Sequence, residues 1–174
     1  ILASRGSGDI GNNITHIFDD GVVPIGGRGQ GLGEVVMSLS YFEENFSEEF
    51  KHPRNMVTGF VNADEINTST QQALDSGQIH FMPYRQLVSR TINRSELLAD
   101  IDAITEQLTA AVDYPLDGMV IECTDERVKE HMGAASNNYR WQIAKKTLGE
   151  TAETSILDIG WQTGRTGQVT PELR

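Results

Sequence analysis

Two short apolar stretches in the second half of the chain carry the charged residues best suited to chemistry. Residues 114–122 predict one strand, with Asp117 where its apolar residues begin, and residues 139–146 predict another that ends in Lys145 and Lys146. If the two strands are neighbours, an acid and a lysine meet over an apolar floor, which suits a phosphate or a metal–phosphate pair. The structural alternative is that Asp-Gly marks a turn and that the charges are solvated.

A second carboxylate and an aromatic residue stand in two other predicted strands. Glu34 follows a glycine among the apolar residues of a strand at 32–39. Buried carboxylates are rare without a partner, so Glu34 is either a functional group or a residue of an edge strand that faces water. Tyr84 ends a strand at 79–84, where Pro83 indicates an edge or a bulge. It is either a stacking surface or a core residue with a satisfied hydroxyl group.

Two glycine-rich stretches, at 5–11 and 26–33, interrupt the first part of the chain, and Arg5 stands at the base of the first. Glycine lets a backbone approach a ligand closely, although tight hairpins need it as well. The first stretch is not a Walker phosphate loop, because no Gly-Lys-Ser/Thr follows it. The second is interpreted as a flexible connection.

Helices are expected between these strands. Residues 12–18 predict one helical turn. Ser40 and Glu43 have the spacing of a capping box, which predicts a helix that starts at Ser40 and runs to about Phe50. Pro53 is placed to begin the next helix in its first turn.

The clearest helix covers residues 93–108, with Asn93 or Ser95 as its cap, and its apolar stripe is expected to pack against the sheet. The stripe consists of Leu97, Leu98, Ile101, Ile104 and Leu108. A short charged helix at 125–132, ended by Gly133, lies between the two strands of the opening paragraph.

The last part of the chain predicts a strand at 154–161 and then a hairpin at 162–171 that presents Arg165. Strands and helices mix along the chain without regular alternation. The pattern therefore predicts an α+β fold with a largely antiparallel sheet, and not a doubly wound fold.

Length and composition narrow the classes of protein. The chain has 174 residues, enough for one domain with a hydrophobic core, and Ile1 to Ser4 read as the end of a strand in a piece of a longer protein. A net charge of −11 disfavours binding of nucleic acid by bulk attraction, although local basic spots remain compatible with it. The single cysteine, Cys123, excludes an internal disulfide and a cysteine-rich zinc site. No signal peptide or membrane span is recognised, so a soluble protein of a reducing compartment is expected.

Seven segments, in order and nearly end to end, form one pattern. They are Arg5-Gly-Ser-Gly-Asp-Ile-Gly-Asn-Asn-Ile-Thr15, Gly33-Glu-Val-Val-Met37, His52-Pro-Arg-Asn55 with Gly59, Tyr84, Leu116-Asp-Gly-Met-Val-Ile121, Arg140-Trp-Gln-Ile-Ala-Lys-Lys146 and Gln162-Thr-Gly-Arg-Thr-Gly-Gln-Val-Thr-Pro171. This pattern resembles the bacterial NAD-dependent DNA ligases, in their adenylation (nucleotidyltransferase) domain. The last two segments are the most specific, and the first is the least specific.

The resemblance implies an antiparallel nucleotidyltransferase core, similar to an ATP-grasp-like ligase core, over residues 1–153, and the first strands of an OB-fold over residues 154–174. In that family a lysine attacks the α-phosphate of NAD and releases nicotinamide mononucleotide. The adenylate then passes to a DNA 5′-phosphate and the nick is sealed, with magnesium assisting. The lysine must lose its proton to attack, because its ordinary pKa is about 10.4.

The resemblance also assigns roles to five residues around the nucleotide. Glu34 would hold the ribose and Tyr84 would stack on the adenine. Asp117 would act near the metal and the phosphate, Lys146 would contact the α-phosphate, and Arg5 would complete the nucleotide site. Asp117, Lys146 and Glu34 would be the catalytic residues, and no side-chain cluster of the chain is assigned as a metal site of its own.

Nicked duplex DNA is the implied partner. Arg54 would face a phosphate or the nick, and Arg165 would begin the DNA-binding barrel. The family's nucleophile stands in a Lys-x-Asp-Gly motif shortly before the arginine-glycine loop, so we expect it ahead of Ile1, in an N-terminal part of the same ligase. These 174 residues alone are therefore expected to be inactive. No membrane partner is implied, and the expected location is the cytoplasm of a bacterial or virus-infected cell.

The chain departs from the family pattern at four positions. Glu122 stands where the family has a second lysine in the Asp-Gly strand, and Asn62 stands where it has an arginine. Ser7 replaces an aspartate of the first loop, and Leu32 replaces an arginine before the glutamate strand. The pattern is therefore that of a diverged member.

Two other interpretations stay open. Glu122, Asn62 and the acidic balance favour a degenerate ligase relative that binds DNA or serves as a scaffold subunit without catalysis. The retention of catalytic residues disfavours it. Another nucleotidyltransferase, such as an ATP-dependent ligase or a capping enzyme, is disfavoured by the Pro-Arg-Asn and Gln-x-Gly-Arg-Thr-Gly segments.

Overall fold

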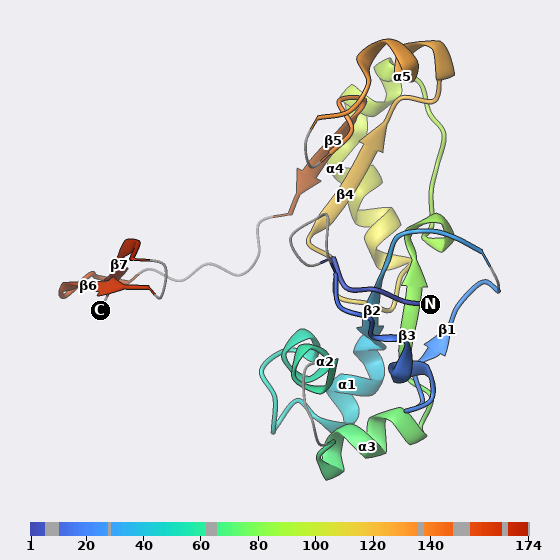
Figure 1. Ribbon diagram of the computed structural model, residues 1–174. Coiled ribbons are helices and arrows are strands. Elements are labelled where there is room, and N and C mark those ends of the chain that lie inside the picture. The colour runs from blue at the N-terminus through green and yellow to red at the C-terminus, as the bar shows by residue number, and fades with distance from the viewer. Residues whose placement is uncertain are drawn as a thin grey trace.

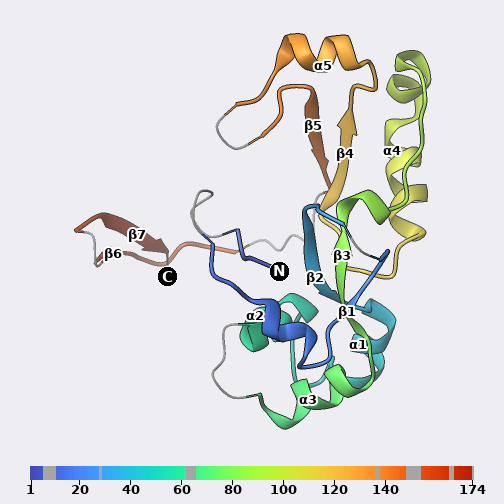
Figure 2. The same ribbon diagram turned by 45° about the vertical axis from the view of Figure 1, so that its right-hand side comes forward.

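The structure is a computed structural model that describes residues 1–5, 11–27, 29–61, 66–135, 138–147, 154–164 and 167–173. Figures 1 and 2 show two bodies, one above the other, and a hairpin that lies apart from both. We call the described residues of 1–86 the sheet lobe and those of 94–147 the ribbon lobe. The two lobes carry different elements, and each contributes some of the predicted site residues.

The sheet lobe is built on a three-stranded sheet in the order β1–β3–β2. Strand β3 (Ile79–Pro83) is central, with β2 (Gly33–Met37) antiparallel on one side and the short β1 (Val23–Pro24) parallel on the other. The predicted strands at 32–39 and 79–84 are thus present and adjacent.

Pro83 was expected to mark an edge or a bulge, but it ends the central strand. The Tyr84 amide donates a hydrogen bond to the Leu32 carbonyl at 2.9 Å, so the nitrogen of Pro83 faces the other side of β3. On that side β1 has already ended, opposite Phe81. A proline at this position therefore removes no hydrogen bond from the sheet.

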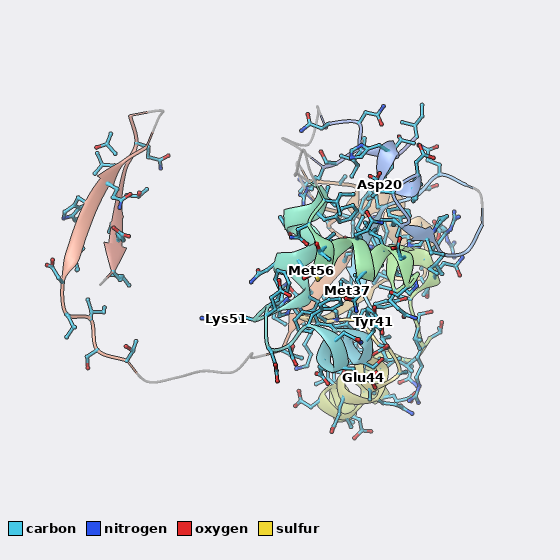
Figure 3. The ribbon with its side chains drawn as sticks, turned by 90° about the horizontal axis from the view of Figure 1, so that it is seen from below. Asp20, Met37, Tyr41, Glu44, Lys51 and Met56 are labelled. Carbon is cyan, nitrogen blue, oxygen red and sulfur yellow. The ribbon has the colours of Figure 1, made fainter. Side chains whose placement is uncertain are left out.

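Four helical segments cover the sheet, namely a 3₁₀ turn at Thr15–Phe18 and the helices α1 (Leu39–Asn45), α2 (Pro53–Val61) and α3 (Thr68–Asp75). Their apolar side chains form the core with Met37 of β2, and Met37 and Met56 lie inside the lobe while Lys51 reaches outward (Figure 3). The expected turn at 12–18 and the helix start at Pro53 are confirmed. The core members are Ile17, Val22, Met37, Phe42, Phe46, Met56, Val57, Phe60, Ala73, Leu74 and Ile79.

The prediction for α1 was wrong at both ends. The cap is Ser38, whose hydroxyl oxygen accepts a hydrogen bond from the Tyr41 amide at 3.3 Å, and the helix ends at Asn45 instead of Phe50. Ser40 instead lies inside the helix, as its second residue, where its amide and its hydroxyl group donate to Asp113, a residue of the ribbon lobe. A local capping pattern contains no sign of this distant partner.

The ribbon lobe consists of a two-stranded antiparallel ribbon and two helices. The ribbon pairs β4 (Gly118–Glu122) with β5 (Gln142–Lys146), and its connection contains α5 (Glu126–Met132), which ends at Gly133 as predicted. Helix α4 (Arg94–Ala110) packs on the ribbon, with the Thr105 hydroxyl 3.5 Å from the Met119 sulfur.

Helix α4 differs in part from its prediction. Asn93 is the cap, because its side chain accepts a hydrogen bond from the Glu96 amide at 2.9 Å. Asp100 has a non-helical backbone with φ −129° and ψ 26°, so the helix is kinked there. Beyond the kink Ile104 is buried, whereas Leu98 before it is 63% exposed. The predicted stripe is thus partly or fully buried at Leu97, Ile101, Ile104 and Leu108 and exposed only at Leu98, and the sheet on which α4 packs is the ribbon.

The hairpin pairs β6 (Ile159–Thr163) with β7 (Val169–Leu173), so the strand predicted at 154–161 begins later than expected. Residues paired across an antiparallel ribbon share a face. One face of the hairpin thus carries Ile159, Trp161, Val169 and Leu173, whose exposed fractions lie between 49% and 68%.

Small antiparallel sheets and separate helices confirm the α+β class. The proposed boundary between 153 and 154 stays a prediction. Among the described residues, no helix combines the length and the apolar character needed to cross a bilayer.

Candidate functional site

The acid and the lysine of the two ribbon strands do meet. Gly118 of β4 is paired with Lys146 of β5, and Asp117 directly precedes the pair. Lys146 Nζ lies 2.5 Å from Asp117 Oδ2, and both side chains are largely exposed, at 66% and 70%. The hydrogen bond from Lys146 is the main cause that lowers the pKa of Asp117 below its usual value. Asp117 is therefore ionised at neutral pH, and both side chains are open to a ligand.

The neighbouring lysine serves another purpose. Lys145 is paired with Met119, so it lies on the opposite face of the ribbon, where its Nζ is 2.7 Å from Asp102 Oδ1 of α4. Because the two lysines alternate across the ribbon, only Lys146 belongs to the face that carries Asp117.

Gly118 is required at the open end of the ribbon. Its φ is +147°, and a Cβ atom there would lie 2.1 Å from the Lys145 carbonyl oxygen. Any side chain would push the strands apart beside Asp117 and Lys146. The Asp-Gly pair thus does more than form a turn, because it permits the close strand contact that brings the acid to the lysine.

Glu34 and Tyr84 form a second pair, in the sheet lobe. Glu34 lies opposite Met82 in the β2–β3 register, and Tyr84 starts a 3₁₀ turn (Tyr84–Gln86) directly after β3. The Tyr84 hydroxyl donates to Glu34 Oε1 at 2.8 Å, while half of Tyr84 remains exposed. Tyr84 thus has a satisfied hydroxyl group and also an open ring face, and Glu34 has a partner without being buried.

Electrostatic effects connect the two pairs across the lobes. Burial is the main cause that raises the pKa of Tyr84 to about 12, and the hydrogen bond to Glu34, the charge of Glu34 and the charge of Asp117 add to it. The charge of Arg5 acts on the pKa of Tyr84 in the opposite direction. The charges of Asp117 and Arg5 therefore both act on the Tyr84 hydroxyl group.

Arg54, from α2, completes the group of charges. Its charge contributes to the lowered pKa of Asp117, after the larger effects of Lys146. The structure thus places the predicted residues Glu34 with Tyr84 and Asp117 with Lys146 in direct contact, and the charges of Arg5, Arg54 and Asp117 link these pairs electrostatically. Arg165 lies outside the described residues.

The ribbon face beyond Lys146 changes character along its length. Val120, which is 62% exposed, is paired with Ala144 in the middle of this face. At the far end Gln142 Nε2 donates to Glu122 Oε2 at 2.9 Å. A strip with a cation at one end, an apolar middle and polar atoms at the other end can carry a flat aromatic group attached to a phosphate.

Sequence reasoning missed two features. Tyr139 stacks on Trp141 with ring centroids 4.7 Å apart, and Lys129 Nζ lies 4.8 Å from the Trp141 ring. The alternation of Tyr139 and Trp141 could have suggested an aromatic pair. The other missed residue is Asp113, whose contacts with the end of β2 carry no local signal.

A magnesium ion is compatible with the site only if phosphates supply most of its ligands. Within the described ranges, no three His, Cys, Asp or Glu groups gather as a metal site requires. Magnesium is commonly bound through one or two carboxylates together with substrate phosphates and water. Asp117, which is exposed beside Lys146, fits this kind of binding, in which the protein supplies few of the ligands.

Comparisons with known proteins bear on the whole chain. No family model matches it. A DNA ligase from Desulfatibacillum aliphaticivorans is 51% identical over 173 residues, 99% of this chain. DNA ligases from Psychromonas ingrahamii and Shewanella baltica are 41% and 38% identical, each over 98% of the chain. The chain is homologous to a segment of DNA ligases. It spans about a quarter of these relatives, 27% of the first and 26% of the other two.

Proposed function

We propose that the chain is the central and C-terminal part of the adenylation domain of an NAD-dependent DNA ligase, followed by the first strands of its OB-fold. The observation that carries this proposal is the presence of the Glu34–Tyr84 pair and the Asp117–Lys146 pair, with the charge of Asp117 acting on Tyr84. The homology to DNA ligases over nearly the whole chain supports it. The whole protein would seal nicks in duplex DNA.

NAD would supply the adenylyl group and release nicotinamide mononucleotide. The half-exposed ring of Tyr84 offers a flat face for the adenine, with its hydroxyl group held by Glu34. Glu34 uses one carboxylate oxygen for Tyr84, and a carboxylate has lone pairs for the ribose hydroxyls as well. These two residues would therefore bind and orient the nucleoside.

The ribbon lobe would act on the phosphate. Lys146 is exposed and ion-paired with Asp117, so its ammonium group can offset the negative charge that develops on the α-phosphate during transfer. Asp117 holds Lys146 in place and would also contact a magnesium ion bound mainly by phosphate oxygens. Arg5 and Arg54 add positive charge from the sheet lobe, and Arg54 together with Arg165 would contact DNA. The lysine that accepts the adenylate is not assigned to any residue of this chain.

One observation favours the alternative of a scaffold without catalysis. Glu122 stands where the resemblance predicts a lysine, and its carboxylate is held by Gln142 on the same ribbon face as Lys146. A negative charge there would weaken any contact that needs a cation. The two functions differ in what they require of Lys146, since only the enzyme needs its charge.

The test is a chimera in which this chain replaces the matching segment of the Desulfatibacillum ligase, which is 51% identical to it. We expect the chimera to take label from radiolabelled NAD and to seal a nicked duplex in the presence of magnesium. Lys146→Ala should reduce sealing by about 10²- to 10³-fold, as loss of one transition-state contact does. The 174-residue chain alone should take no label.

Lys145→Ala is the matched control, because Lys145 lies on the other face and pairs with Asp102. It should stay within a few-fold of the unmodified chimera. A folded chimera that takes no label from NAD contradicts the enzyme. Full sealing activity in the Lys146→Ala chimera contradicts the role of Lys146 and favours a scaffold role for this segment.

A further inference from the structure

Asp113, in the segment that joins α4 to β4, reaches across to the end of β2. Its Oδ2 atom accepts hydrogen bonds from the Ser38 hydroxyl at 2.6 Å and from the Ser40 hydroxyl at 2.8 Å. Its Oδ1 atom accepts from the Ser40 amide at 3.0 Å, and its backbone carbonyl accepts from the Leu39 amide at 3.0 Å. Four hydrogen bonds thus attach one residue of the ribbon lobe to the sheet lobe.

In this contact the two serines are the hydrogen-bond donors and Asp113 is the acceptor. Ser38 and Ser40 also lie 3.1 Å apart, but each hydroxyl group has a single hydrogen, and Asp113 accepts both. Ser38 is buried, and its oxygen accepts from the Tyr41 amide as the cap of α1. Its amide donates to the carbonyl of Gln78, the residue just before β3. Asp113 is therefore attached to a rigid corner of the sheet lobe.

Tyr114 makes a second attachment beside the first. Its hydroxyl oxygen lies 2.9 Å from His80 Nδ1 of β3, and the two rings meet edge to face at 5.8 Å. Consecutive residues thus hold the corner where β2 ends and β3 begins. Among the described residues, the helices and strands of the two lobes have few direct contacts otherwise (Figures 1 and 2).

The positions along the chain connect this corner to the site. Glu34 lies four residues before Ser38 on β2, and Asp117 lies four residues after Asp113. Each carboxylate is therefore only four residues along the chain from the corner, Glu34 through β2 and Asp117 through the segment that precedes β4. Whatever fixes the corner also fixes the separation of the two halves of the site.

We propose that Asp113 is a positioning residue, whose hydrogen bonds to Ser38 and Ser40 hold Asp117 and Lys146 at their working distance from Glu34 and Tyr84. It rests on the proposed function only in treating these four residues as one site. Asp113 itself touches no substrate in this arrangement. Its role is to set the orientation of the ribbon lobe.

The direct test measures the separation of the lobes in the 174-residue chain. Spin labels are placed on the single native cysteine, Cys123, in the ribbon lobe, and on Glu44→Cys, an exposed position of α1 (Figure 3). Pulsed electron–electron double resonance should give one narrow distribution of the distance between the two labels. Asp113→Ala should broaden or shift it, and Asp113→Asn, which keeps an acceptor oxygen, should give an intermediate result.

Asp102→Ala is the matched control, since it removes an aspartate whose ion pair with Lys145 lies within the ribbon lobe. It should leave the distribution unchanged. Ser40→Ala removes one hydrogen bond at an exposed position and keeps the core intact, so it supplies a result even if Asp113→Ala does not fold. A distribution that stays narrow and unshifted in Asp113→Ala, or in Ser40→Ala where that is the folded variant, overturns the proposal.

The ligase chimera supplies a second readout. In the chimera, Asp113→Ala should displace Asp117 and Lys146 and lower kcat for nick sealing by about 10- to 100-fold, because a misplacement near 1 Å can have that effect. The KM for NAD should stay within a few-fold, because Glu34 and Tyr84 remain in the intact sheet lobe. A change in KM alone would contradict positioning. Loss of activity in the unmodified chimera would instead contradict the proposed function and leave the distance measurement as the deciding test of Asp113.

Discussion

The sheet lobe and the ribbon lobe are held together by different forces. In the described part of the chain, every buried hydrophobic side chain except Ile104 lies in the sheet lobe. The ribbon lobe instead exposes Val120 and Ile143, at 62% and 67%, and depends on the β4–β5 hydrogen bonds, one face of α4 and ion pairs. Burial of apolar surface is the main source of stability, so the sheet lobe should be the more stable of the two.

This difference divides the candidate site. Glu34, Tyr84, Arg5 and Arg54 come from the lobe with the core, and Asp117 and Lys146 come from the lobe without one. A nucleoside would thus bind to the more stable sheet lobe, whereas the phosphate would bind to Asp117 and Lys146 of the less stable ribbon lobe. The hydrogen bonds of Asp113 matter because they fix the orientation of the ribbon lobe on the sheet lobe.

The largest expected effect is on the core of the sheet lobe. Phe42→Ala removes a ring that is 4% exposed, and it should lower the free energy of unfolding by about 3–5 kcal/mol. Leu98→Ala, at a side chain of α4 that is 63% exposed, should change it by less than about 0.5 kcal/mol. Urea unfolding of both variants measures the difference, and equal losses would contradict the contrast between the lobes.

A smaller effect on stability is expected when one glycine in each lobe is replaced by alanine. Gly118→Ala forces a Cβ atom against the Lys145 carbonyl at φ +147°, so it should destabilise the ribbon by about 1–3 kcal/mol. Gly59→Ala, in α2 with no atom near the added Cβ, should stabilise the sheet lobe by about 0.5–1 kcal/mol. Hydrogen exchange should show lost protection in β4 and β5 alone for Gly118→Ala. Uniform loss through both lobes would show that they unfold as one unit.

The pKa of Tyr84 tests the Glu34 contact. Glu34→Gln removes a charge that helps to raise this pKa, so it should fall below its value of about 12 but stay above 10.0, because burial remains the main cause. A group whose pKa is raised by folding stabilises the fold below its unfolded pKa, and that contribution is lost as the pH rises from 10 to 12. Absorbance titration of the phenol follows the change. Glu43→Gln, on the exposed side of α1, should leave the titration unaltered.

The smallest effect concerns stability at the exposed ion pair. Lys146→Ala should change the free energy of unfolding by less than about 1 kcal/mol, since exposed pairs contribute little. The pKa of Asp117 should nevertheless rise toward its usual value, because Lys146 is the main cause of its lowering. The lowered pKa stabilises the fold above the unfolded value, and this contribution is lost as the pH falls below about 4. Carboxyl NMR titration measures it, and Lys145→Ala should leave the pKa of Asp117 unmoved.

The elements of the site could be predicted where the local pattern and the packing agree. The strands around Glu34 and around Asp117, and the meeting of Asp117 with Lys146, follow from apolar runs with charges at their ends. The hydrogen bond between Glu34 and Tyr84 could not be derived in the same way. It depends on the register of β2 with β3 and on the 3₁₀ turn after Pro83.

The errors at α1 and α4 have different origins. Ser40 has the spacing of a cap, but the helix begins earlier, with Ser38 as its cap, and both serines donate to Asp113, more than seventy positions away in the chain. Helix α4 is kinked at Asp100, and of the predicted stripe only Leu98 is exposed. Both features arise from tertiary contacts or local distortion, which a helical period cannot express.

The hairpin of β6 and β7 has a consequence for the behaviour of the isolated chain in solution. One of its faces is apolar and exposed at Ile159, Trp161, Val169 and Leu173. The net charge of −11 should keep molecules apart in dilute buffer. Because the screening length falls from about 10 Å at 0.1 M salt to about 3 Å at 1 M, that repulsion weakens as salt is added. The 174-residue chain should thus self-associate through this face at high ionic strength, and Trp161→Ser should restore the monomer.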